Sequence, residues 1–303
     1  MFLNCNKITQ LNLSLIDTKN VTDMSHMLDG CTQLKYINLT NFNTEKVKNM
    51  EFMFNKCLNL EELFLTSFNT QNVIEMSNMF TSCTYLKLLD ISTFNTKNVI
   101  NMPNMFNNCT DLIEIIFSPL FSNENTINMN SMFNDCKNIE YLDLSFLKLQ
   151  KIENISAMFY GCSNLKGVTL DHIKIKNVKD TNFLFAYCHN LENLKLNFEN
   201  TENLEEMNCM FLECSKLEFL DLSSIKTQNI KSMNCMFSKC SNLINLNLSS
   251  LDTRKCNNNK NELMFEGCTK LKEIMINNNI DPTYFKNELI TANLDENIIK
   301  INN

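Results

Sequence analysis

Apolar side chains recur along this chain in a short motif that uses two different spacings. After Cys57 the apolar positions are Leu60, Leu63 and Leu65, and the L-x-L end of that run alternates with a period of two. Successive side chains of a strand point to opposite faces, so the run predicts a short strand with one buried face. Residues 62 and 64 then point outward.

A second set of apolar positions follows the predicted strand at spacings of three to five residues. Its members in this stretch are Phe68, Val73, Met76, Met79 and Phe80. The spacing is too irregular for one strand and too short for a full helix. We therefore predict a turn at residues 68–70, a second extended piece near residue 73 and one helical turn at residues 76–80.

The same motif repeats along nearly the whole chain, and one cysteine marks each copy. The marks lie 26 residues apart, except for one step of 27 and a last step of 28. They are Cys5, Cys31, Cys57, Cys83, Cys109, Cys136, Cys162, Cys188, Cys214, Cys240 and Cys268. Self-similarity at one fixed period predicts a solenoid, in which each coil buries its open faces against its neighbours.

The averaged repeat reads M-F-x-x-C-x-x-L-x-x-L-x-L-S-x-F-N-T-x-N-V-x-x-M. It resembles the 26-residue repeat of bacterial surface proteins, a branch of the BspA-like leucine-rich repeats common in mycoplasma-type lipoproteins. The Gly-Cys steps at residues 30–31, 161–162 and 267–268 look like that family's Gly-Cys step, and "FNTKNV" at residues 94–99 looks like its "FDTSNV". The resemblance implies a solenoid displayed on a cell surface for adhesion or for binding host and matrix molecules, and it brings no active site.

We therefore predict a leucine-rich-repeat-like solenoid of about eleven coils over residues 1–276. Short parallel strands are expected on one face, with turns or short helical turns on the other. Residues 277–303 abandon the repeat and contain Pro282, so we predict a C-terminal cap that shields the last coil.

Three coils depart from the repeat, and we expect them to bulge. The coil after Cys109 has one extra residue within residues 118–129, and the coil after Cys240 has two extra residues within residues 251–265. In the coil after Cys162, residues 171–185 place Thr and Leu where Met is expected.

The beginning of the chain lacks the counterpart of a cap. Met1 and Phe2 already occupy the M-F positions of the repeat, three residues before Cys5. A solenoid that begins in the middle of a coil exposes unpaired backbone N–H and C=O groups at its edge. We therefore expect this sequence to be a fragment whose missing N-terminal part could hold a signal or lipoprotein segment. Localisation stays open: cell surface by the resemblance, or cytoplasmic if the chain is complete as written.

Charge and hydropathy exclude two classes of partner. The chain carries 34 acidic and 27 basic residues, for a net charge of −7, and no run of Lys or Arg interrupts their even scatter. Phosphate contacts are therefore not favoured, and we expect no nucleic-acid partner. No apolar stretch approaches the roughly 20 residues that a transmembrane helix needs.

The fourteen cysteines raise the question of disulfides and metals. Stacked coils would bring neighbouring repeat cysteines within reach of one another, so bridges stay possible, but the apolar surroundings favour a ladder of buried thiols. The spacing C-x4-C occurs at Cys209 with Cys214 and at Cys235 with Cys240. Structural zinc sites usually draw their four thiolates from C-x2-C hairpins, which are absent, so we expect no zinc, no other metal and no cofactor.

Two polar ladders recur at the predicted turn. Thr44, Thr70 and Thr96 form one, and the Asn residues that precede them form the other. Asn side chains bond their own backbone two residues on, and stacked Asn can bond one another between coils. We interpret both ladders as turn chemistry. The sequence offers no catalytic constellation, so we expect no enzyme.

The outward side chains of the predicted strands are the best candidates for function. Apolar members fall on five successive coils: Tyr36, Phe64, Leu88, Ile116 and Tyr141. If they are contiguous, they form an apolar stripe of the kind that marks interfaces. The alternative is that they only improve packing across the strands. We expect a non-catalytic surface adhesion protein with a macromolecular ligand. The rival is an intracellular repeat scaffold for protein–protein interaction, favoured by the many cysteines, because reducing compartments keep thiols reduced.

Overall fold

The computed structural model describes residues 1–192, 194–256, 263–278 and 280–302. The chain divides into two compact units. Unit 1 comprises Met1–Ile139 and Phe146–Lys151, and unit 2 comprises Glu140–Ser145 and Ile152–Asn303.

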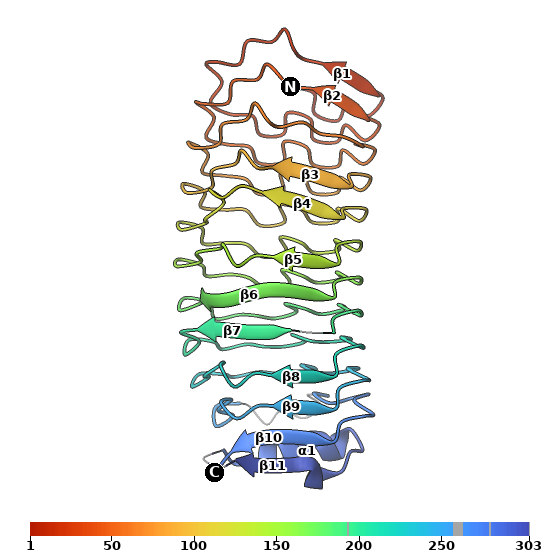
Figure 1. The fold of residues 1–303 in the computed structure, drawn as a ribbon, viewed down its shortest axis with the longest axis vertical. Helices are drawn as coiled ribbons and strands as arrows, with labels where there is room; N and C mark the ends of the chain where they lie inside the picture. The colour runs from red at the N-terminus through yellow and green to blue at the C-terminus, as the bar shows by residue number, and fades with distance from the viewer. Residues whose placement is uncertain (193, 257–262, 279, 303) are drawn as a thin grey trace. The chain divides into compact units, whose positions relative to one another are not determined.

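Unit 1 is a stack of coils with short parallel strands along one face (Figure 1). Strand β1 (Gln10–Asn12) pairs with β2 (Tyr36–Asn38), and β3 (Leu88–Ile91) pairs with β4 (Glu114–Phe117). Paired residues are one repeat apart, as in Leu11 opposite Ile37. One 26-residue repeat therefore makes one coil.

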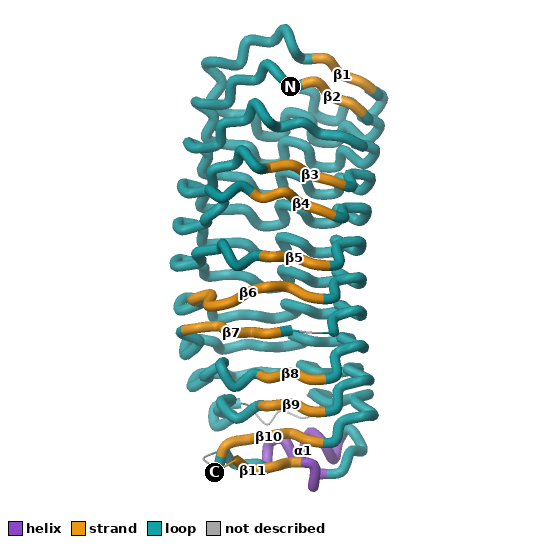
Figure 2. Tube along the Cα trace, in the orientation of Figure 1, coloured by secondary structure: helices purple, strands orange, loops and turns teal. Residues whose placement is uncertain are grey.

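Unit 2 has the same construction. Its first sheet contains β5 (Tyr141–Asp143), β6 (Gly167–Lys174) and β7 (Lys195–Glu199), in that order. Its second sheet contains β8 (Phe219–Asp221), β9 (Asn245–Asn247), β10 (Glu273–Asn277) and β11 (Ile299–Asn302). All these pairings are parallel, and loops and turns make up most of each coil (Figure 2). The predicted leucine-rich-repeat-like solenoid is confirmed.

The extended piece predicted near residue 73 is also present, as a second parallel ladder. In unit 1 single bridges join Asn49 to Glu75 and Glu75 to Asn101. In unit 2 the same position forms bridges from Asp180 to Glu206 and from Glu206 to Ser232. Coils that share both a strand pairing and a bridge are therefore tied together at two places on their circumference.

The segment predicted as a helical turn at residues 76–80 consists instead of consecutive tight turns. Asn78 and Ser82 have φ of +58° and +60°, in the left-handed region that no right-handed helix contains. The Cys83 N–H bonds within the coil to the Phe80 carbonyl, at 3.1 Å, whereas the Phe80 N–H donates to Met105 of the next coil, at 2.9 Å. Alternating backbone conformation thus sends every second N–H group to the neighbouring coil, which a helix would retain internally.

The Gly-Cys step has its origin in this backbone conformation. Gly30 has φ of +76° and stands at the same repeat position as Ser82. An added Cβ at Gly30 would lie 2.2 Å from Oδ1 of Asn4. Glycine adopts left-handed φ without the steric cost that a Cβ brings, so this position suits it.

The core of each unit is built from ladders of identical side chains. In unit 1 the rings of Phe54, Phe80 and Phe106 stack at centroid distances of 5.6 and 5.8 Å. In unit 2 Phe185 and Phe211 stack at 5.8 Å. Each Phe lies three residues before a repeat cysteine that is itself buried, so the predicted ladder of buried thiols is confirmed.

The Thr ladder joins neighbouring coils through hydrogen bonds. The Thr70 hydroxyl donates to the Asn95 carbonyl at 3.0 Å and accepts the Asn95 N–H at 2.7 Å. The Asn95 side chain accepts the Lys97 N–H, which is the predicted turn bond. The hydrogen bond from an Asn side-chain amide to the neighbouring coil comes from a different residue, Asn98. Its Nδ2 donates to the Gln71 carbonyl at 2.8 Å.

Two of the three expected bulges lie among the described residues. The pairing of β6 with β7 shifts register between Asp171 and Lys174, as expected for the coil after Cys162. In the coil after Cys109, Asn123 takes up the extra residue with φ of +58° and buries its side chain, whose Oδ1 accepts the Thr96 hydroxyl at 2.6 Å. The two extra residues expected after Cys240 fall on residues 257–262, outside the described part of the chain.

The segment after the last repeat cysteine continues the sheet and adds a helix. Strand β11 pairs with β10, with Ile299 opposite Ile274. Helix α1 (Thr283–Thr291) buries Phe285 and Leu289, and the 3-10 helix η1 (Glu296–Ile298) leads into β11. The Glu288 carboxylate accepts the Met264 N–H at 3.1 Å, which ties α1 to the preceding coil.

Candidate binding surface

The strands present two outward columns on each unit, at the fifth and seventh positions after the repeat cysteine. Side chains between and beside them point inward, as Leu63 and Leu65 do with exposed fractions of 5% and 1%. The predicted outward residues of unit 1 are all exposed, by 41% for Tyr36, 60% for Phe64, 49% for Leu88 and 40% for Ile116. Tyr141 is 67% exposed and belongs to unit 2.

The four residues of unit 1 alternate between the two columns rather than forming one straight line. Tyr36 and Leu88 stand at the fifth position, whereas Phe64 and Ile116 stand at the seventh. The pairing of β3 with β4 shows this, because Leu88 lies opposite Glu114 and Ile116 lies opposite Asp90. The result is a zigzag of apolar groups with polar side chains between them.

Two further exposed apolar side chains of unit 1 were missed by the sequence pattern. Tyr85 lies on the coil of Leu88, and Ile113 lies on the coil of Ile116. Both stand before the strand, so the alternation of inward and outward positions did not select them. We call the exposed apolar residues on or just before the strand positions of unit 1 the apolar strand face: Tyr36, Phe64, Tyr85, Leu88, Ile113 and Ile116.

The side chain at the seventh position after the repeat cysteine normally caps the turn that follows the strand. In coils that carry Asn or Asp there, the side chain accepts a backbone N–H two residues on. Examples are Asn12 with Ser14 at 3.0 Å, Asn38 with Thr40 at 3.1 Å and Asp90 with Ser92 at 2.9 Å. The Ser92 hydroxyl and N–H also lower the pKa of the Asp90 carboxyl. Phe64 and Ile116 stand at this capping position and cannot accept that bond.

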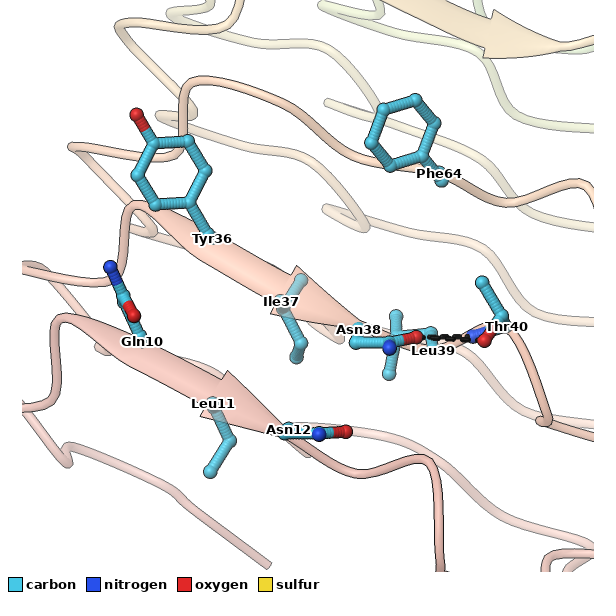
Figure 3. Close-up of a pocket in the computed structure, with 9 residues that line it drawn as sticks. All are labelled: Gln10, Leu11, Asn12, Tyr36, Ile37, Asn38, Leu39, Thr40 and Phe64. Atoms are coloured by element: carbon cyan, nitrogen blue, oxygen red, sulfur yellow. Dashed lines mark hydrogen bonds between the residues drawn. The ribbon is translucent and has the colours of Figure 1, made fainter.

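A shallow groove of about 580 Å³ opens at the beginning of unit 1. Figure 3 shows its outer rim, formed by Gln10, Asn12, Tyr36, Asn38, Thr40 and Phe64. Leu11, Ile37 and Leu39 supply its floor from behind the strands. We call it the N-terminal groove. Its rim contains two aromatic rings, three side-chain amides and the hydroxyls of Thr40 and Tyr36.

Hydrogen bonds outside the groove hold the Tyr36 ring. The Tyr36 hydroxyl donates to the Glu61 carboxylate at 2.9 Å, and Lys35 donates to the same carboxylate at 3.0 Å. Lys35 and Tyr36 together lower the pKa of the Glu61 carboxyl, and the bond to Glu61 raises the pKa of the Tyr36 hydroxyl. These bonds hold the ring at its hydroxyl end, and the side chain stays partly exposed to solvent.

The grooves of unit 2 have a different character, because charged side chains line them. One groove of about 390 Å³ surrounds Phe219 and includes Lys195, Asp221 and Glu273. Another, of about 320 Å³, lies beside Tyr141, whose ring has the Lys166 ammonium 5.9 Å from its centroid. The two units thus offer different recognition chemistry on equivalent strand positions.

No group of three His, Cys, Asp or Glu side chains among the described residues could hold a metal ion. Cys214 and Cys240 are buried, and their thiols donate to carbonyls of the preceding coil. Cys209 and Cys235 are partly exposed neighbours on adjacent coils, at φ of +54° and +53°. The C-x4-C spacing therefore combines two different environments. Within the described chain, no helix has the length and apolar character needed to cross a membrane.

Comparison with known proteins identifies a family and similar solved structures. A family model described as "Mycoplasma protein of unknown function, DUF285" matches residues 1–116, 83–193 and 153–279. No curated protein matches the chain. Among solved structures, the chain is similar to a leucine-rich cell surface protein from Faecalibacterium prausnitzii A2-165. The two are 11% identical, with 98% of this chain and 88% of that chain covered and a TM-score of 0.34.

Proposed function

This chain belongs to the family described as Mycoplasma protein of unknown function, DUF285, and we propose that it is a non-catalytic adhesion protein of the cell surface. Its apolar strand face binds a macromolecular partner. The sequence resemblance to bacterial surface repeats is the reason for placing this binding outside the cell.

One observation carries the proposal. Phe64 and Ile116 occupy a capping position where neighbouring coils use Asn or Asp, so they forgo a turn bond and also expose apolar surface to water. Both effects lower the stability of the chain without a partner, because a turn loses its hydrogen bond and apolar surface stays in contact with water. Places where a sequence breaks a local rule with no gain to its own fold are typically functional sites.

The energy available from such a face suits a protein or glycan interface. Fully burying one Phe or Ile side chain against a partner is worth about 1.5–3 kcal/mol. A few residues of this size at the centre of a contact carry most of the binding energy in typical interfaces. Apolar and amide side chains supply no nucleophile or general base, which is why we propose binding without catalysis.

A second candidate, an intracellular scaffold, is favoured by the fourteen cysteines of the chain, which the structure contains as thiols. Reducing compartments maintain such thiols. Intact source cells distinguish the two locations. An antibody against this chain should label intact cells if the protein is displayed, and should label them only after permeabilisation if it is an intracellular scaffold.

The binding claim is tested with beads coated with the purified chain and a panel of immobilised collagen, laminin, mucin and neutral glycans. We expect retention on at least one surface, and at least a tenfold loss with Phe64→Asn. Ile74→Thr is the matched control, because Ile74 is also exposed but lies off the strand face, at a position where another coil has Thr22. Equal losses with both variants, or no retention of the wild type, would refute the proposal.

A further inference from the structure

We infer that the N-terminal groove is a subsite for a neutral carbohydrate, with room for one or two pyranose units of a glycan. This inference rests on the proposed function, because it names the chemical class of a partner for part of the same face. Four features of the groove support it: its lack of charge, its fixed amides, its aromatic rims and its spacing.

The first feature is the absence of charge among the residues that line the groove. Its polar side-chain groups are the amides of Gln10, Asn12 and Asn38, the hydroxyl of Thr40, and the Tyr36 hydroxyl, which is bonded to Glu61. Amides and hydroxyls both donate and accept hydrogen bonds, as vicinal sugar hydroxyls do. A charged peptide or phosphate would instead need a counter-charge, of the kind that Lys195, Asp221 and Glu273 provide in the groove of unit 2.

The second feature is that two amides are held in fixed orientations. Oδ1 of Asn12 accepts the Ser14 N–H, and Oδ1 of Asn38 accepts the N–H and the hydroxyl of Thr40, at 3.1 and 2.8 Å. No acceptor among the described residues engages Nδ2 of either Asn. Each turn therefore presents a pre-oriented NH₂ donor, and such preorganisation lowers the entropy lost on binding.

The third feature is the pair of aromatic rings. Figure 3 shows the rings of Tyr36 and Phe64 projecting from successive coils, with Asn38 at the other end of β2 from Tyr36. Tyr36 is tethered through Glu61 at its hydroxyl, and Phe64 is 60% exposed. Exposed rings offer flat apolar surfaces on which the C–H faces of a pyranose can pack, while the amides bond its hydroxyl edge.

The fourth feature is the spacing set by the parallel strands. Asn12 lies directly opposite Asn38 in the register of β1 and β2. Neighbouring strands lie about 4.8 Å apart, so the two NH₂ donors repeat at about the length of one pyranose ring. Successive coils can therefore contact successive sugar units of a chain that runs along the stack of unit 1.

The test uses the full chain and an array of neutral gluco-, manno-, galacto- and N-acetylglucosamine oligosaccharides, followed by calorimetry on those retained. The decisive variant is Asn12→Asp with Asn38→Asp. It preserves the turn acceptors, because Asp90 accepts the same bond in its own coil, but replaces both NH₂ donors by carboxylate oxygens. We expect the Kd for the retained glycan to rise at least tenfold. Asp90→Asn, outside the groove, should change the Kd less than twofold.

The outcomes separate this inference from the proposed function. Failure of the wild type to retain any neutral glycan at millimolar concentration overturns the inference, as does unchanged affinity in the double Asp variant. If that variant still binds an immobilised protein that Phe64→Asn fails to bind, the proposed function stands and the glycan subsite is refuted. Thermal unfolding of the double Asp variant and of Phe64→Asn, both expected to be folded at the assay temperature, excludes loss of fold as the cause.

Discussion

At the scale of single residues, the repeat cysteine acts as a hydrogen-bond donor as well as a small apolar group. The Cys109 thiol donates to the Phe80 carbonyl of the preceding coil at 3.1 Å, and Cys83 donates to Phe54 at 3.3 Å. Alanine would fill part of the space but could not make this bond. The need for a small donor in an apolar core explains why one residue type recurs at this position.

These buried thiols make the stability of the chain sensitive to alkaline pH. Burial raises the pKa of the Cys109 thiol from 9.0 to about 12, because the core disfavours the thiolate. A folded pKa above the unfolded value contributes stability that is fully present below pH 9 and is lost as the pH rises toward 12. Urea unfolding should therefore give a constant free energy of unfolding from about pH 6 to 8 and a steep decline above about pH 9.

Cys109→Ala isolates the contribution of one thiol. It should lower the free energy of unfolding at neutral pH by about 1–3 kcal/mol through the lost bond and a small cavity. Between about pH 10 and 11 its decline should be shallower than that of the wild type by about 1.4 kcal/mol per pH unit. Identical slopes for the two proteins would show that the thiol is solvated.

At the scale of the structural element, a buried Thr hydroxyl holds the turn that follows the strand position in several coils. Thr70 is fully buried and satisfies both the N–H and the carbonyl of Asn95 in the next coil. Thr44 makes the same two bonds with Asn69. The Thr ladder therefore stabilises the stack in parallel with the strand pairing.

Thr70→Val tests this element directly. The substitution preserves shape but leaves the backbone N–H and carbonyl of Asn95 without their partner in a buried place. We expect a loss of about 2–4 kcal/mol in the free energy of unfolding, measured with urea. Thr70→Ser, which keeps the hydroxyl, should lose less than half as much. A larger loss with Thr70→Ser than with Thr70→Val would show that the methyl group, rather than the hydrogen bonds, is what matters.

The sequence was enough to predict the coils but not the backbone conformation of every part of a coil. The L-x-L alternation and the cysteine period were enough to predict strands, stacking and the outward position of Phe64. The tight turns were mistaken for a helical turn because Met76, Met79 and Phe80 have spacings that helices share. Left-handed φ at Phe52 and Cys209 leaves no trace in composition, since neither is Gly or Asn. The zigzag of the apolar side chains became visible only with the strand register.

At the scale of the whole molecule, repetition fixes the scaffold and leaves the outward columns free to vary. The N-terminal groove of unit 1 uses them for aromatic rings and neutral amides, while the groove around Phe219 in unit 2 uses them for charges. Local sequence motifs do not describe recognition on such a face, because the residues that form it lie one repeat apart in the sequence.

The central claim is that the apolar strand face exists for a partner and not for the fold. Phe64→Asn with Ile116→Asn tests it, because each new Asn can accept the turn N–H as Asn38 and Asn12 do, without placing a second carboxylate opposite Asp90. The decisive measurement is the free energy of unfolding of this double variant beside its retention on the surface that binds the wild type. We predict equal or higher stability with at least a tenfold loss of retention. A fall in stability of about 2 kcal/mol or more with retention intact would show that these side chains serve packing, and would contradict the claim.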